Sequence, residues 1–283
     1  MLWSTLTGKL EQAKALDPLV KGADAVIGTA LPKGPLKDAL HGTWLGHSLH
    51  PLLVALPIGL WSGGILLDWT GGDKRAARRL IGAGVLAVAP TAASGWADWS
   101  EIGDAKRPRR VGLVHAVANI ATTTLFAASW KARGRGEHWR GKRLALAGSA
   151  GLAVGGYLGG HLAYAQAVGV NRNADEIRKP KDWVDAALAA DLVEGLPKAV
   201  QVKGNRVVLV RTAGVIRAIG GTCSHWGAPL EEGTVVDGCL ECPWHGSRFR
   251  LEDGSVARGP ATTPQLAYDV QTVGDRVQVR VRP

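Results

Sequence analysis

Hydrophobic positions in this chain form long uninterrupted blocks up to residue 171 and short alternating stretches after residue 183. In the first part, four runs contain no Lys, Arg, Asp or Glu, and charged residues bound each run. A membrane-spanning helix needs about 20 predominantly apolar residues. The runs therefore predict four spans, which are residues 51–69, 79–98, 111–130 and 143–167. A soluble bundle of buried helices is the alternative, but it would not need such basic loops between the runs.

The ends of the predicted spans and the segment before them support a membrane domain over residues 41–171. Tryptophans such as Trp69, Trp99 and Trp130 fall at or near span ends, where interfacial aromatic side chains gather. Residues 1–40 form an amphipathic segment, because its first apolar positions recur at helical spacing. This segment either lies on the membrane surface or packs against the rest of the protein.

The chain changes character after a polar and charged linker, residues 172–183. Residues 184–283 contain short β-type stretches separated by turn signals such as Asp253-Gly254 and Gly274-Asp275. About 100 residues of this pattern predict a small all-β domain. The predicted fold is therefore an N-terminal all-α four-helix transmembrane bundle followed by a C-terminal all-β domain.

Composition and charge exclude nucleic acid as a partner. The chain has 283 residues, with 34 Lys and Arg against 24 Asp and Glu, and a net charge of +10. The basic residues form short clusters between apolar runs, which is typical of membrane loops and not of a nucleic-acid-binding face. Near the spans, ten lie on the side of the termini and ten on the opposite side. The positive-inside rule therefore does not assign the side on which the β domain lies.

Two short stretches of the all-β region carry the residues of a metal site. "CSHWGAPL" and "CPWHGSRF" place a C-x-H pattern sixteen residues before a C-x-x-H pattern. Two thiolates and two imidazoles on paired loops can hold a [2Fe-2S] cluster, with the cysteines on one iron and the histidines on the other. The four candidate ligands are Cys223, His225, Cys242 and His245. A structural zinc ion held by the same four residues is the alternative.

These stretches, together with the "GPATTPQLAYDV" that follows them, resemble the Rieske [2Fe-2S] family over about residues 184–283. Ala228 and Trp244 stand where Rieske proteins of cytochrome bc complexes carry a disulfide, and Phe249 stands where they carry a Tyr. The chain therefore resembles the ferredoxin-type Rieske proteins of oxygenase systems, which implies a potential in the lower part of the family's range. Around the cluster we expect four supporting residues: Gly227, Pro243, Gly246 and Ser247.

Histidines also gather at the terminal side of the predicted bundle. His115 and His161 lie at similar depth in the third and fourth spans, and His47 and His50 precede the first span. Two imidazoles from facing helices can ligate a b-type haem, and ionisable groups inside a membrane mark functional sites. The four histidines are therefore a candidate haem or quinone site, with a hydrogen-bonded polar network as the alternative. A glycine ridge over residues 151–159 lets a flat ligand or another helix approach.

The helical region resembles a known family as well. "WLGHSLHPLLVALPIGLW", "HAVAN" and "GGHLAYAQAVGVN" are similar to an uncharacterised family of four-helix bacterial membrane proteins over about residues 40–171. This resemblance implies a multi-pass protein of the cell membrane. Since the family has no assigned function, the resemblance supports the topology and adds no chemistry.

Taken together, these patterns predict a membrane-embedded electron-transfer protein. A Rieske cluster would pass electrons to or from a haem b or quinone site in the bundle, with a redox protein or a quinone as partner. The alternative is a non-enzymatic membrane anchor or redox sensor that carries a Rieske ferredoxin domain for a partner complex. The sequence contains no nucleophile–base constellation or phosphate loop, so it predicts no complete catalytic site.

Overall fold

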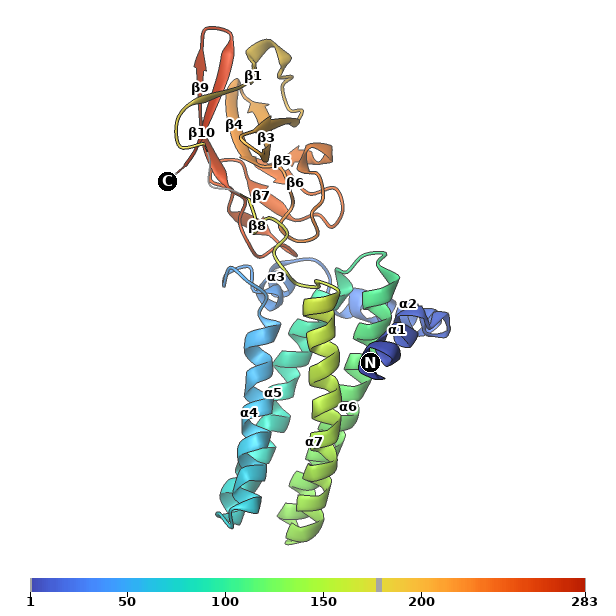
Figure 1. Cartoon of the computed structure of the whole chain (residues 1–283). Coiled ribbons are helices and arrows are strands. Elements are labelled where there is room, and N and C mark those ends of the chain that lie inside the picture. Colours follow the sequence, from blue (N-terminus) through green and yellow to red (C-terminus); the bar gives the residue numbers. More distant parts are fainter. Residues whose placement is uncertain (1, 177–179, 283) are drawn as a thin grey trace. The chain divides into compact units, whose positions relative to one another are not determined.

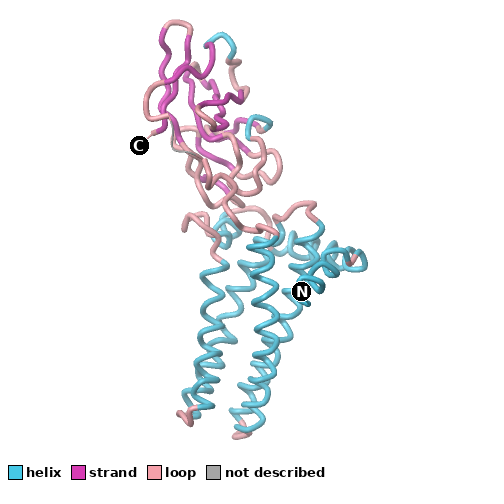
Figure 2. Tube along the Cα trace, in the orientation of Figure 1, coloured by secondary structure: helices cyan, strands magenta, loops and turns pink. Residues whose placement is uncertain are grey.

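The computed structural model describes residues 2–176 and 180–282, with helices in the first part of the chain and strands in the second (Figure 2). By internal contacts the chain forms two compact units. The helical unit contains the residues up to Pro32 together with Leu49–Val168. The β unit contains Lys33–Ser48 together with the residues from Gly169 onward. The expected boundary at residue 41 therefore differs from the structural division.

Two short helices and four long ones form the described part of the helical unit, and the long helices α4 to α7 run side by side (Figure 1). Their bounds are Leu2–Gln12 for α1, Asp17–Ala30 for α2, His50–Trp69 for α4, Lys74–Ser100 for α5, Lys106–Gly134 for α6 and His138–Gly160 for α7. A 3₁₀ turn at Lys14–Leu16 separates α1 from α2, and a π-helical turn at His161–Ala165 continues α7.

Three helices of the described chain, α4, α5 and α6, are long and apolar enough to cross a membrane. The first three expected spans lie within them. The fourth, residues 143–167, falls on α7 and its π-helical continuation, which are not among the three. α7 contains seven glycines, and this composition lowers its hydropathy. The number of candidate spans is thus three instead of four, while the class of fold is the expected one.

Stacked rings and small residues form the core of the helical unit. Trp61 of α4 stacks on Phe126 of α6, with ring centroids 4.1 Å apart. Ile81 and Ala145 are fully buried beside them. On the outer surface large apolar side chains remain exposed, as expected of a surface that faces lipid: Leu52, Leu66, Leu86 and Ile120.

Helix α2 buries Val20 and Ile27, pairs its acidic residues with arginines of α6, and leaves other apolar side chains exposed. Asp17 accepts hydrogen bonds of 2.6 and 2.8 Å from Arg110, and Asp24 pairs with Arg109. Leu19, by contrast, is 61% exposed. This distribution fits a helix at a membrane surface. The N-terminal segment therefore packs on the helical unit and also presents an apolar outer face.

The β unit is built of two antiparallel sheets, with strand orders β1-β10-β9-β4-β3-β2 and β5-β6-β7-β8. The bounds of the first sheet are β1 Val184–Leu188, β2 Lys198–Val202, β3 Asn205–Thr212, β4 Val215–Gly220, β9 Ala267–Val273 and β10 Arg276–Val281. Those of the second are β5 Thr234–Val236, β6 Cys239–Glu241, β7 Arg248–Arg250 and β8 Val256–Arg258. The short helix α3, Pro35–His41, belongs to the same unit.

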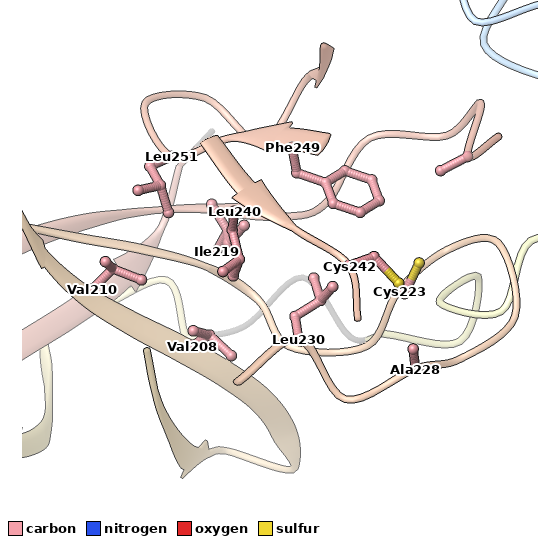
Figure 3. Close-up of a cluster of buried hydrophobic side chains, with 11 residues drawn as sticks. Val208, Val210, Ile219, Cys223, Ala228, Leu230, Leu240, Cys242, Phe249 and Leu251 are labelled. Carbon is pink, nitrogen blue, oxygen red and sulfur yellow. The ribbon is translucent and has the colours of Figure 1, made fainter. Parts of the chain in front are cut away.

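A cluster of fully buried side chains joins this core to the two candidate metal loops. Val208, Leu240 and Phe249 belong to this cluster, and so do Cys223 and Cys242 (Figure 3). The cysteines therefore lie at the edge of the hydrophobic core, where apolar side chains keep water from the sulfur atoms.

Candidate metal centre

The two loops that carry the candidate ligands repeat the same backbone turn. The carbonyl of Cys223 accepts a hydrogen bond from the N–H of Gly227 at 2.8 Å, and that of Cys242 accepts one from Gly246 at 3.0 Å. Each cysteine N–H donates to the carbonyl five residues further on, at 2.9 and 2.8 Å. Both glycines have left-handed φ angles, +77° and +75°, which side chains rarely adopt. The repeated turn presents both cysteines in the same way.

The loops bring the four candidate ligands together as two like pairs. Cys223 and Cys242 are buried, and their thiols are hydrogen-bonded to each other (Figure 3). The rings of His225 and His245 are nearly perpendicular, with centroids 4.9 Å apart. A cluster of two irons needs this division, with two sulfur ligands on one metal and two nitrogen ligands on the other.

The environment of the two histidines suits metal ligation. The Nδ1 atoms of both rings are buried, and Nδ1 of His225 has no hydrogen-bond partner in the described parts of the chain. Buried polar atoms normally have a partner, so this nitrogen is suited to a metal. Within residues 2–176 and 180–282, no three His, Cys, Asp or Glu side chains converge on one point as ligands of one ion.

Hydrogen bonding and burial set the protonation of these groups. The Cys223 thiol and three backbone amides of the second loop lower the pKa of Cys242. The same thiol pairing, together with burial, raises the pKa of Cys223. Burial and the neighbouring charge of His245 hold the pKa of His225 well below its usual range. The site therefore favours one thiolate and a neutral imidazole, which are the protonation states that bind metal.

The expected supporting residues lie in the two loops that carry the candidate ligands. Ser247 is fully buried, and its Oγ accepts a 2.9 Å hydrogen bond from the N–H of Ala261, so its own O–H remains a donor. Pro243 is exposed in the second loop, next to Trp244, which is 55% exposed. Phe249 is fully buried and has no hydroxyl to donate.

The structure adds a segment to this site that sequence reasoning missed. Lys33 donates from Nζ to the carbonyl of His245 at 2.8 Å. The N–H of Gly259 donates to Asp38 Oδ1 at 2.9 Å, and Thr263 donates to the carbonyl of Gly46 at 3.3 Å. Residues 33–48 thus line the second cluster loop, although they precede the first membrane helix in the sequence. No local motif marks them, because their partners lie more than 200 positions away.

The helical histidines are distributed differently from the sequence prediction. His115 donates from Nδ1 to the carbonyl of Gly155 at 2.9 Å, and Asn119 Nδ2 lies 3.1 Å from its Nε2. His50 contacts the carbonyl of Thr91 through Nδ1 at 3.0 Å. His50 and His115 are also close enough to interact electrostatically.

The other two histidines have separate surroundings. His161 Nε2 lies 2.8 Å from Glu11 Oε1, which also accepts a 2.9 Å hydrogen bond from Gln166. Burial raises the pKa of Glu11, but the hydrogen bonds from these two residues outweigh it and lower the pKa overall. His47 is exposed and contacts the carbonyl of Ser48 at 3.0 Å. His161 therefore anchors the N-terminal helix, a role that the spacing of apolar residues did not reveal.

A compact β domain with two Cys/His loops, attached to apolar helices, defines a membrane-associated iron–sulfur protein. Residues 182–274 match the Rieske [2Fe-2S] domain, and residues 46–172 match a predicted membrane protein domain, DUF2231. The chain belongs to the Rieske [2Fe-2S] family, here fused to a DUF2231 domain. The family implies a [2Fe-2S] cluster, and the candidate residues fit it.

Similar proteins include small ferredoxins and much longer chains. The ferredoxin component of naphthalene 1,2-dioxygenase/salicylate 5-hydroxylase systems from Ralstonia sp. is 31% identical over 36% of this chain and 97% of its own length. Human apoptosis-inducing factor 3 is 34% identical, but this chain spans only 17% of it. A solved ferredoxin of carbazole 1,9a-dioxygenase from Nocardioides aromaticivorans IC177 is 33% identical, with a TM-score of 0.34, over 35% of this chain and 98% of its own.

Proposed function

We propose that this chain is a membrane-anchored Rieske electron carrier of the ferredoxin type, which exchanges single electrons with a redox partner protein at a bacterial cell membrane. The observation that carries the proposal is the pairing of two buried thiols and two imidazoles on equivalent loops. The β unit resembles the ferredoxin components of dioxygenase systems from Ralstonia and Burkholderia. This similarity supports a role as an electron carrier.

In this proposal Cys223, His225, Cys242 and His245 hold the cluster. When bound, the cluster supplies reversible one-electron transfer. Backbone amides of both loops donate toward the sulfur atoms and stabilise their negative charge. The buried side chains of Leu230 and Phe249 exclude water from that side. Fully buried Phe249 donates no hydrogen bond, which favours a potential in the lower part of the family's range.

The proposal includes a second redox centre in the helical unit, a haem b or a quinone. Support comes from two partly buried imidazoles, His50 on α4 and His115 on α6, which interact electrostatically with each other in an apolar bundle. A cluster and such a centre would exchange electrons one at a time. If the helical unit held no second centre, the chain would be an anchored carrier for a partner complex.

The test is purification of the full-length chain in detergent under anaerobic conditions. We expect two non-haem irons and two acid-labile sulfides per chain and, after reduction by dithionite, the EPR signal of a Rieske cluster. The reduced carrier should pass one electron to an added one-electron acceptor. A single zinc ion per chain, with no EPR signal after iron and sulfide reconstitution, would refute the proposed function.

A further inference from the structure

The helical unit repeats itself, and the repeat is visible in its contacts. Three pairs of residues on α4 and α6 are each 65 positions apart in the sequence. The pairs are His50 and His115, Trp61 and Phe126, and Asp68 and Arg133. Positions eleven and eighteen residues after the histidine fall on one face of a helix, about three and five turns on. The three residues on each helix therefore form a stripe along one face, and the two stripes occupy equivalent positions on α4 and α6.

The second helix of each hairpin repeats in the same way. The Nδ1 atom of His50 contacts the carbonyl of Thr91 on α5, and that of His115 contacts the carbonyl of Gly155 on α7. Thr91 and Gly155 are 64 positions apart. Four residues later each helix has a glycine under the imidazole. A Cβ at Gly95 would lie 2.8 Å from His50 Cε1, and one at Gly159 would lie 3.2 Å from His115 Cε1.

The aromatic rings of the core also each pack against a glycine of the next helix. A Cβ at Gly84 of α5 would lie 2.5 Å from Trp61, and one at Gly148 of α7 would lie 2.9 Å from Phe126. These glycines are again 64 positions apart. The helix pairs α4–α5 and α6–α7 are thus two copies of one helical hairpin. The equivalent residues occur in the same order in both copies, so the repeat is a parallel one.

Equivalent residues of the two copies contact each other or lie close enough to interact electrostatically. Trp61 stacks on Phe126, Arg133 donates to Asp68, and His50 interacts with His115. In a pair of copies related by a twofold rotation, a residue can touch its own equivalent only near the rotation axis. The two histidines therefore lie beside the axis at one end of the stripe, and the ion pair lies at the other end.

We infer that His50 and His115, one from each hairpin, form a two-histidine site on this axis that binds a haem b. The inference rests on the proposed function and names the residues of its second centre. Both histidines use Nδ1 toward a main-chain carbonyl, which orients the ring and leaves the lone pair on Nε2. Two imidazoles from facing helices suit an iron porphyrin in an apolar bundle.

Two neighbouring features shape this site. Asn119 Nδ2, 3.1 Å from His115 Nε2, occupies the position that an iron ligand would take, so its amide has to turn away when haem binds. The corresponding position in the first hairpin is Val54, which has no polar atom in its side chain. His161 is outside the site, because its Nε2 is already paired with Glu11.

The experiment is a pyridine haemochrome assay on the full-length chain produced with added haem precursor. We expect about one haem per chain, a loss of more than about tenfold in His50→Ala and in His115→Ala, and unchanged content in His161→Ala. Where an alanine variant does not fold, His115→Met is used, because a Met ligand keeps the haem but shifts its absorption bands. A structural histidine would not produce such a shift.

Two results would overturn the inference: wild-type chain without haem, or haem lost in His161→Ala and retained in His50→Ala. The Rieske EPR signal is measured on the same samples. A chain with the Rieske signal and no haem leaves the proposed carrier intact and removes the two-histidine haem site. A chain with haem and no Rieske signal does the reverse.

Discussion

Asp68 of α4 and Arg133 of α6 form an ion pair with both partners buried, their side chains 6% and 1% exposed. Arg133 Nη1 donates to Asp68 Oδ1 at 2.8 Å, and its Nε donates to Ser129 at 3.1 Å. Because these residues occupy equivalent positions of the two hairpins, the pair joins one copy to the other. A buried charge left without its partner is costly, so each residue depends on the other.

Removal of one partner should therefore destabilise the bundle strongly. We expect Asp68→Ala to cost about 3–5 kcal/mol, measured as a lower midpoint of thermal unfolding in detergent. The matched control is Glu137→Ala, which breaks the exposed pair of Glu137 and Arg140 at 2.9 Å and should cost less than about 0.5 kcal/mol. Equal midpoints for the two variants would contradict the buried pair.

The glycines under the aromatic rings give a second prediction. Gly84→Ala and Gly148→Ala should each cost about 1–3 kcal/mol, because their new methyl groups would lie 2.5 and 2.9 Å from ring atoms of Trp61 and Phe126. Gly156→Ala is the control, since a Cβ there meets nothing within 4 Å. Thermal unfolding followed by circular dichroism compares the three. If only one of the first two variants were destabilised, the two hairpins would not pack equivalently.

Substitution of single cysteines should distinguish a cluster ligand, Cys242, from a structural thiol, Cys239. Cys242→Ser should lose the visible absorption and the EPR signal of the cluster. Cys239→Ala should keep both, because Cys239 lies in β6, paired with Val236 and Arg250, away from the two loops. Iron content per chain provides the measurement. Loss of iron in the Cys239 variant would mean that the ligand set is different.

Lys33 should raise the reduction potential of the cluster. Its ammonium lies 2.8 Å from the carbonyl of His245, where a positive charge favours the more negative, reduced state. We expect Lys33→Gln to lower the midpoint potential by about 30–60 mV in a redox titration followed by EPR. Lys33→Arg should retain the wild-type potential, and so should Lys203→Gln in the exposed β2–β3 turn. An unchanged potential in Lys33→Gln would show that the charge is screened.

Glu176 gives a pH-dependent prediction for stability. Burial, with a smaller effect of Asp175, raises its pKa to about 7 from the ordinary value near 4.5. Between these values the folded state holds a proton that the unfolded state has released, so stability should fall as pH rises from about 4.5 to 7. Glu176→Gln should remove this dependence and gain roughly 1–2 kcal/mol at pH 8, after allowance for partial exposure. Denaturant unfolding at several pH values tests the slope, and a slope of opposite sign would contradict it.

The cluster loops were predictable because their chemistry is local. Each ligand pair is separated by one or two residues, and the glycines that shape the turn lie within four residues of each cysteine. The apolar helices were predictable for the same reason, since a membrane imposes a minimum length on each one. The repeat of the helical hairpin is also visible in the sequence, because His50 and His115, like Trp61 and Phe126, are 65 positions apart. A search for internal repeats is needed to find this spacing.

The sequence by itself determined the two kinds of fold and the identity of the candidate cluster ligands, because periodicity and short spacings are properties of neighbouring residues. Only the tertiary structure decided which distant residues meet. It paired His161 with Glu11 rather than with His115, brought His50 to His115, and placed Lys33 against His245. These partners lie 65 to 212 positions apart, and no local pattern encodes such distances. They are set by the packing of whole helices and loops, which depends on all the side chains between them.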